Sequence, residues 1–155
     1  MIPEFDPGTR ALPPGNHKAT LEEIGERLGF TPRRQWLLKG LRAAVEAFRA
    51  AGIQEVFIDG SFCTEKPDPA DIDGYWVEPD EGVYDRIDPY WIDFELELVP
   101  LVRKWKWRMW RDYGVEFFIH PAMQATPDLG FPEFFRKDRD GQPRGVIQVI
   151  KTGPS

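Results

Sequence analysis

The sequence has few side chains that form disulfides or bind soft metal ions: one cysteine and two histidines among 155 residues. A single cysteine excludes an internal disulfide, and these three side chains are too few for a zinc site with four Cys or His ligands. The sequence also lacks the apolar run of roughly 18–20 residues that a membrane span needs, and it does not begin like a signal peptide. The chain also has no excess of positive charge, and its formal net charge is −6. This negative net charge argues against a protein that coats nucleic acid. We therefore expect a cytoplasmic protein without membrane contact.

Apolar residues are plentiful enough for one sizeable core. Hydrophobic residues make up 41% of the chain, and aromatic residues alone make up 14%. A chain of this length is typical of a single domain and buries roughly 70% of the surface that it exposes when unfolded. We therefore expect one domain over residues 1–155. Residues 1–19 contain four prolines, which predict an irregular N-terminal arm.

Capping signals mark the beginnings of two predicted helices. The first is expected over residues 20–29, where Thr20 supplies the N-cap and Glu23 reaches back to a free amide to complete a capping box. The second is expected over residues 32–51, where Thr31 precedes a proline that suits the first helical position. Apolar residues at helical spacing follow in the second segment and predict one buried face.

Runs of β-branched and aromatic residues predict four strands, of which the last is an edge or terminal strand. A further, mostly helical stretch is expected over residues 90–112, with a break at Pro100. This order of elements predicts an α/β (α+β) fold, in which a mixed sheet is flanked by helices. The strands are expected at residues 54–59, 72–77, 115–120 and 146–151.

The segment with the clearest chemical signal joins the first two strands. The first strand ends in Gly60 and Ser61, and nine residues later Asp71 and Asp73 begin the next strand. Because strand side chains alternate between faces, the two carboxylates project to the same side, about 7 Å apart. A hard divalent cation such as Mg²⁺ or Mn²⁺ relieves their repulsion. The Gly60 amide and the Ser61 hydroxyl can hold a phosphate oxygen, so the segment predicts a site for a nucleoside triphosphate and its metal ion.

This Gly-Ser turn, its spacer and the Asp-x-Asp sequence resemble the signature of the DNA polymerase β-like nucleotidyltransferase superfamily. The wider chain looks most like a bacterial family of small predicted nucleotidyltransferases. That similarity is carried by residues 12–24 (LPPGNHKATLEEI) and residues 134–147 (FFRKDRDGQPRGVI), besides the central motif. The resemblance implies a minimal nucleotidyltransferase-like fold.

The resemblance also implies a third carboxylate on a strand next to the Asp-x-Asp strand. Glu116 is the candidate, because it is an acid on an otherwise apolar strand, where an acid is costly unless it faces a site or a partner. By this resemblance Asp71, Asp73 and Glu116 are catalytic residues and ligands of Mg²⁺ or Mn²⁺. The residues assigned to the nucleotide are Gly60, Ser61 and Lys66.

The implied reaction transfers a nucleoside monophosphate from a nucleoside triphosphate to a hydroxyl group, and pyrophosphate leaves. The acceptor is a protein, an RNA or a small molecule. Relatives of similar size occur in toxin–antitoxin or phage-defence modules, so the resemblance also suggests that context and a protein partner.

Other interpretations of the same residues stay open. A Gly-Ser turn followed by two aspartates is also typical of an ordinary hairpin in which an aspartate caps the turn. Glu116 is alternatively a structural acid in a salt bridge, and Lys66 a solvated loop residue. The alternative function is a non-catalytic module of the same fold that acts by binding protein or RNA.

A basic and aromatic segment has two interpretations. Residues 103–111 (RKWKWRMWR) contain five bases, three tryptophans and no acid. One interpretation is an amphipathic helix whose tryptophans lie partly in the core while the bases are solvated. The other is a surface for RNA or for an acidic partner, because aromatic rings stack on bases and cationic side chains bind phosphates.

Overall fold

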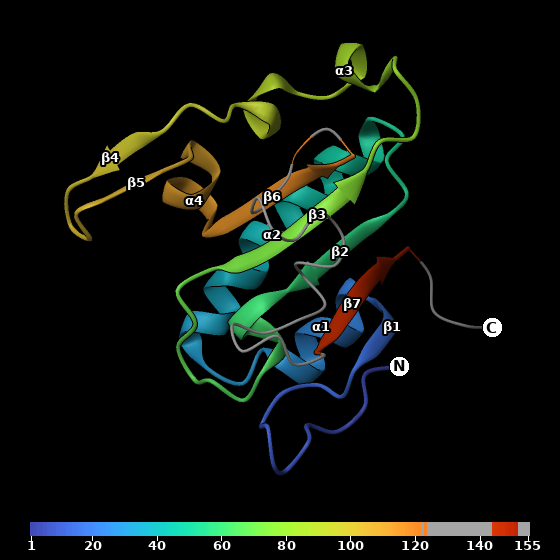
Figure 1. Ribbon diagram of the computed structural model, residues 1–155, viewed down its shortest axis with the longest axis vertical. Helices are drawn as coiled ribbons and strands as arrows, with labels where there is room; N and C mark the ends of the chain where they lie inside the picture. The colour runs from blue at the N-terminus through green and yellow to red at the C-terminus, as the bar shows by residue number, and fades with distance from the viewer. Residues whose placement is uncertain (122, 124–143, 152–155) are drawn as a thin grey trace.

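The structure is a computed structural model that describes residues 1–121, 123 and 144–151. Most of the sequence segment 134–147 therefore lies outside the described residues. The main sheet is formed by β1 (Gly15–Thr20), β2 (Val56–Asp59), β3 (Ile72–Val77), β6 (Val115–His120) and β7 (Gly145–Ile150). Its order is β1-β7-β2-β3-β6, with β2 antiparallel to both neighbours and the other two pairs parallel (Figure 1). The predicted α/β class, a mixed sheet flanked by helices, is confirmed.

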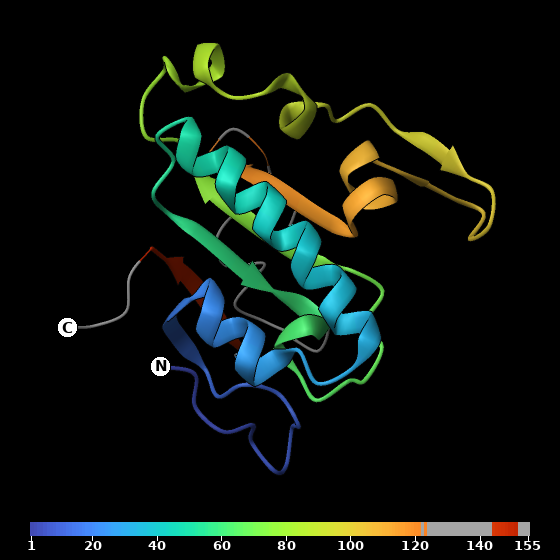
Figure 2. The same cartoon turned by 180° about the vertical axis from the view of Figure 1, so that it is seen from behind.

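Two helices cover one face of this sheet, α1 (Leu21–Leu28) and α2 (Pro32–Ala50) (Figure 2). Both predicted N-caps are confirmed: Thr20 accepts from the Glu23 amide and Thr31 accepts from the Arg34 amide. The capping box is wrong in its second half, because the Glu23 carboxylate accepts a hydrogen bond from the Ile2 amide at 3.0 Å. Glu23 thereby ties the N-terminal arm to α1. Among the described residues, no helix combines the length and apolar character needed to cross a bilayer.

The two faces of the sheet differ in character. On the helical face, Phe48 of α2 contacts the rings of Trp76 and Phe117, with centroid distances of 5.9 and 5.1 Å. Because side chains alternate along a strand, Asp73 and Tyr75 of β3 lie on the opposite face. The acidic residues at the ends of the strands therefore lie on the side of the sheet away from α1 and α2.

The two ends of the chain pair in a way that the sequence did not predict. Residues 1–14 lie outside the sheet as expected, but the rest of the predicted arm forms β1, which runs parallel to β7. β7 is the last strand along the described chain, as predicted, but it is not an edge strand of the sheet, since it lies between β1 and β2. The β1 sequence, GNHKAT, has little strand propensity of its own, and it is held by a partner from the far end of the chain.

The prediction of helix over residues 90–112 is largely wrong. After α3 (Val83–Arg86), the chain forms a 3-10 turn (Pro89–Ile92) and a hairpin of β4 (Glu97–Val99) and β5 (Lys104–Lys106). Only α4 (Arg108–Tyr113) is helical at the end of this stretch. Pro100 lies in the turn between β4 and β5, and Trp105 pairs across the hairpin with Leu98. Residues 103–111 thus include strand β5 and the first four residues of α4, in place of one continuous helix.

Candidate metal site

Three carboxylates converge on the open face of the sheet. The register of the parallel strands β3 and β6 places Glu116 directly beside Asp73. Asp71 precedes Asp73 by two residues, just before β3 begins. One carboxylate oxygen from each of the three lies within 4.8 Å of the others. The structure thus brings together the three residues that the sequence assigned to metal binding.

The Gly60–Ser61 turn lies against this triad. Gly60 follows β2, has a φ of +80°, and a Cβ added to it would lie 2.6 Å from Asp73 Oδ2. Only glycine lets the backbone approach this carboxylate so closely without strain. Ser61 is partly buried, and its carbonyl accepts hydrogen bonds from the amide and the hydroxyl of Thr64 at 3.2 and 2.6 Å.

Gly60→Ala is expected to lower both stability and divalent-metal affinity. The left-handed backbone costs a residue with a Cβ about 1–3 kcal/mol, and the added methyl group pushes Asp73 out of place. Gly52→Ala is the matched control, since Gly52 has a φ of +87° but faces only the flexible end of Arg86, at 3.4 Å. Urea unfolding and Mn²⁺ titration should show a stability loss in both variants and a metal-affinity loss in Gly60→Ala alone. Equal Mn²⁺ affinities in the two variants would contradict the role of the close approach.

The loop between this turn and Asp71 is held by the beginning of α2. The buried Arg34 guanidinium donates five hydrogen bonds to main-chain carbonyls. Arg33 donates to the carbonyls of Pro69 and Ala70, and the Thr31 hydroxyl donates to that of Pro67 at 2.7 Å. The carbonyls that accept from Arg34 belong to Leu28, Phe62, Thr64 and Lys66.

Arg34 stays cationic in this position. Burial lowers its pKa to about 10, which still leaves it charged at neutral pH. Its guanidinium also lies over the rings of Phe30 and Phe62, at 4.2 and 4.8 Å from their centroids. The Lys66 side chain, which the sequence assigned to the nucleotide, is exposed on this loop, and its carbonyl is one of the Arg34 acceptors.

A fourth acid, Asp59, lies beside the triad and was missed by the sequence analysis. It is the last residue of β2, it lies opposite Asp73 in the antiparallel register, and only 1% of its surface is exposed. Its Oδ2 forms an ion pair with Arg144 Nη2 at 2.8 Å. Burial raises the pKa of Asp59 to about 7, although Arg144 opposes the shift. Strand alternation from the apolar β2 sequence could have placed this acid on the open face.

Two side chains from the hairpin and α4 contact the triad. The indole Nε1 of Trp110 donates to Asp71 Oδ2 at 2.9 Å, and Lys106 Nζ lies 3.0 Å from Glu116 Oε1. The Lys106 ammonium also lies 5.3 Å from the centre of the Trp110 ring. The salt-bridge interpretation of Glu116 is therefore satisfied geometrically, in addition to its place in the triad. From the sequence, Trp110 and Lys106 were expected in an amphipathic helix or on a surface for RNA or an acidic partner, and neither was connected with the site.

The electrostatics of the triad favour a cation. Burial raises the pKa of Asp73, and the neighbouring charges of Asp71, Glu116 and Asp59 raise it further. Hard divalent ions such as Mg²⁺ prefer carboxylate oxygens and compensate this repulsion. The donor set, its spacing and the close glycine turn therefore fit a Mg²⁺ or Mn²⁺ ion held by Asp71, Asp73 and Glu116.

Metal stabilisation is expected to grow with pH. The folded-state pKa values of Asp59 and Asp73, about 7 and about 8, lie above their ordinary 3.8. The folded metal-free protein therefore binds protons that the unfolded chain has released, and these two groups lower stability as pH rises from about 4 to about 8. A metal ion on the triad must displace the proton of its ligand Asp73, so the rise in Tm on adding Mg²⁺ should be larger near pH 8.5 than near pH 6. Equal shifts at both pH values in thermal melts would contradict proton–metal competition.

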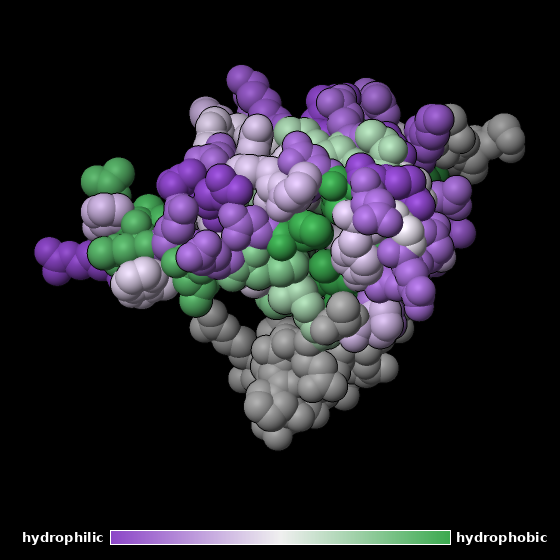
Figure 3. Space-filling model, turned by 90° about the horizontal axis from the view of Figure 1, so that it is seen from above, coloured by the Kyte–Doolittle hydropathy of each residue, from purple (hydrophilic) through white to green (hydrophobic). Residues whose placement is uncertain are grey.

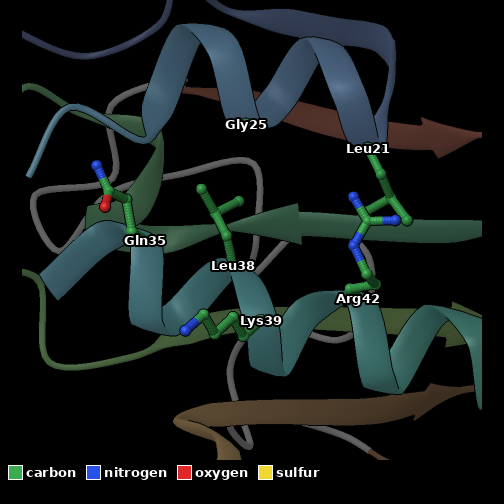
Figure 4. Close-up of a pocket in the computed structure, with 6 residues that line it drawn as sticks. All are labelled: Leu21, Gly25, Gln35, Leu38, Lys39 and Arg42. Atoms are coloured by element: carbon green, nitrogen blue, oxygen red, sulfur yellow. The ribbon is translucent and has the colours of Figure 1, made fainter. Parts of the chain in front are cut away.

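A separate small pocket lies on the helical side of the sheet. Figure 4 shows side chains of α2, among them Gln35, Leu38 and Arg42, turned toward α1. Leu21, Gly25 and Lys39 complete its lining. Since the acidic residues lie on the other face, this pocket is not part of the candidate metal site.

The fold and the site together define an α/β domain with a candidate divalent-metal centre on the open face of its sheet. The chain belongs to the family described as a family of unknown function (DUF6932), whose family model matches residues 3–150. No curated protein and no solved structure matches the chain.

Proposed function

We propose that the protein is a Mg²⁺- or Mn²⁺-dependent nucleotidyltransferase. The observation that carries this proposal is the convergence of Asp71, Asp73 and Glu116 beside the close Gly60–Ser61 turn. The resemblance of this motif to that of the DNA polymerase β-like superfamily supports it. The substrate is a nucleoside triphosphate, and the acceptor is a hydroxyl of a protein, an RNA or a small molecule.

Each residue has a defined task in this proposal. Asp71 and Asp73 hold the divalent cation, which when bound neutralises phosphate charge and favours an ionised acceptor hydroxyl. Glu116 shares the cation and takes the proton of the acceptor hydroxyl. The Gly60 amide and Ser61 hydroxyl bind non-bridging phosphate oxygens. The acceptor oxygen bonds to the α-phosphorus, and the bond to the β-phosphate breaks with its electron pair leaving on pyrophosphate.

The cellular setting follows from the chemistry and the resemblance. Nucleoside triphosphates are cytoplasmic substrates, so we place the protein in the cytoplasm. The resemblance to small bacterial nucleotidyltransferases supports a place in a toxin–antitoxin or phage-defence module, with a protein partner that controls the activity.

Transfer of a labelled nucleotide tests the proposed reaction. The protein is incubated with Mg²⁺ or Mn²⁺, each α-phosphate-labelled nucleoside triphosphate in turn and a bacterial lysate, beside the Asp71→Asn/Asp73→Asn variant. Label that enters protein, RNA or a small molecule only with the wild type supports the transferase and identifies the acceptor class. Label transfer of equal extent with both proteins, or none with either, would contradict the proposal.

A second candidate function is a non-catalytic module that binds a protein or an RNA. Large apolar side chains gather on the projecting β4–β5 hairpin (Figures 1 and 3), next to the exposed bases Arg103 and Lys104. Exposed apolar patches of this kind mark interaction sites. The exposed residues are Leu96, Leu98, Leu101, Val102 and Trp105, with Leu101 97% exposed and Trp105 62% exposed. If the binding module is the correct function, biological activity survives Asp71→Asn/Asp73→Asn and is lost in Leu98→Ser/Trp105→Ser.

A further inference from the structure

Lys106 places a positive charge at the edge of the triad. It ends β5, and its Nζ lies 3.0 Å from Glu116 Oε1, with the two side chains only 23% and 17% exposed. The ring of Trp110 lies 5.3 Å from the ammonium, a distance at which a cation is attracted to the aromatic face. The hairpin and α4 together therefore position this amine over the open face of the sheet.

The contacts from Lys106 and Trp110 engage only one oxygen of each acid. Lys106 contacts Oε1 of Glu116, and Trp110 donates to Oδ2 of Asp71. A carboxylate has about four lone-pair positions, so both acids keep acceptor capacity for a metal ion. A divalent cation on Glu116 repels the ammonium and competes for the same carboxylate, and this weakens the hold of Glu116 on Lys106.

The other described cations near the site have different surroundings. Arg144 is paired with the buried Asp59 at 2.8 Å, and Arg33 donates to the carbonyls of Pro69 and Ala70. Lys66 is exposed on the loop before Asp71. Lys106 combines partial burial, a contact with a triad acid and a flexible four-carbon stem. It is therefore the cation best placed to exchange a carboxylate for a phosphate.

We propose that Lys106 is the phosphate-binding cation of this site and that it exchanges partners. Without a metal ion it pairs with Glu116. When metal and triphosphate are both bound, its ammonium donates to a phosphate oxygen. This inference rests on the proposed function, and it adds a residue outside the Gly-Ser and Asp-x-Asp motif.

The exchange predicts opposite changes in two affinities when the charge is removed. Lys106→Met lacks the ammonium that competes with the metal ion for Glu116. In the absence of triphosphate, Mn²⁺ should therefore bind more tightly to this variant than to wild type. Inorganic triphosphate in the presence of Mn²⁺ should bind about tenfold more weakly, the effect of one charge-assisted hydrogen bond. Lys106→Arg keeps the charge and should stay close to wild type in both titrations.

Lys104→Met is the matched control, because Lys104 lies on the same strand but is exposed. It should leave both affinities unchanged. Isothermal titration gives the affinities, and circular dichroism checks that each variant is folded, with Lys106→Gln as a second neutral variant if Lys106→Met does not fold. Inorganic triphosphate is a suitable probe because it presents the phosphates without depending on the base.

The outcomes separate the inference from the proposed function. If Lys106→Met and Lys106→Gln lower both affinities, Lys106 only positions Glu116 and the partner exchange is wrong. If they change neither, Lys106 does not act on the site. In both cases the proposed metal site stands, provided that wild type binds Mn²⁺ and Mn²⁺ with triphosphate. A wild type that binds neither overturns the proposed function, and the inference with it.

Discussion

Asp73→Asn is expected to lose divalent-metal binding and, at the same time, to stabilise the metal-free protein. Asp73 is the centre of the acidic group, with Glu116 beside it on β6 and Asp59 opposite it on β2. Mutation of residues that only hydrogen-bond to metal ligands lowers metal affinity by about 10–100-fold. Loss of a direct ligand such as Asp73 should therefore lower Mn²⁺ affinity by about a hundredfold or more. In this variant a neutral side-chain amide replaces the Asp73 carboxylate, whose pKa is raised by burial and by its acidic neighbours. At pH 8 we therefore expect about 1 kcal/mol of added stability, or about 2–4 °C in Tm.

Mn²⁺ titration and thermal melts in the presence of a chelator measure the two effects. Asp85→Asn makes the same change of charge at an exposed position of α3, so it is the control. It should leave Mn²⁺ affinity unchanged. An Asp73→Asn variant that binds Mn²⁺ as tightly as wild type would show that the triad does not hold the ion. A variant that melts earlier than wild type would show that Asp73 is primarily a structural acid.

Arg34→Met is expected to cause the largest loss of stability. The guanidinium is fully buried and its five hydrogen bonds end on four carbonyls. Methionine occupies a similar volume but leaves these carbonyls without their donor, and we expect a cost of about 3–5 kcal/mol. Because three of these four carbonyls, those of Phe62, Thr64 and Lys66, lie between the Gly60–Ser61 turn and Asp71, Mn²⁺ affinity should fall as well.

Urea unfolding and Mn²⁺ titration test this expectation. Arg42→Met, at an exposed position of the same helix, should change stability by less than about 0.5 kcal/mol. Arg34→Lys keeps the charge but has a single donor group, so it should recover only part of the loss. If Arg34→Met costs no more than Arg42→Met, the loop does not depend on this guanidinium.

The parts of the fold with local signals could be predicted from the sequence. Thr20 and Thr31 are sequence-local caps, and both begin helices. The alternation of β3 placed Asp71 and Asp73 on one face, and the isolated acid of β6 identified Glu116. The proximity of Glu116 to the two aspartates depends on how the strands pair, because the parallel register of β3 and β6 places Glu116 beside Asp73. The sequence could suggest this register only through the resemblance.

The parts that escaped prediction depend on distant contacts. Among the described residues, β1 pairs only with β7, from the opposite end of the chain, so its own sequence carries little signal. Strand β5 of the hairpin, a tryptophan between two lysines, has a composition that suits a helix or a strand, and cross-strand pairing decides between them. In the sequence, Arg34 is one of two adjacent arginines at the beginning of a helix, and nothing there singles it out. Its burial comes from a loop that closes over it, which no helical periodicity reveals.

The most direct test of the central claim is a crystal structure of the protein grown with Mn²⁺, with anomalous diffraction data to locate the ion. We expect an anomalous peak coordinated by Asp71, Asp73 and Glu116, beside the Gly60–Ser61 turn. The Asp71→Asn/Asp73→Asn variant, crystallised in the same way, should have no peak there. Wild-type crystals without a peak at these three carboxylates, at Mn²⁺ concentrations that saturate the protein in solution, would show that the triad does not hold the metal ion.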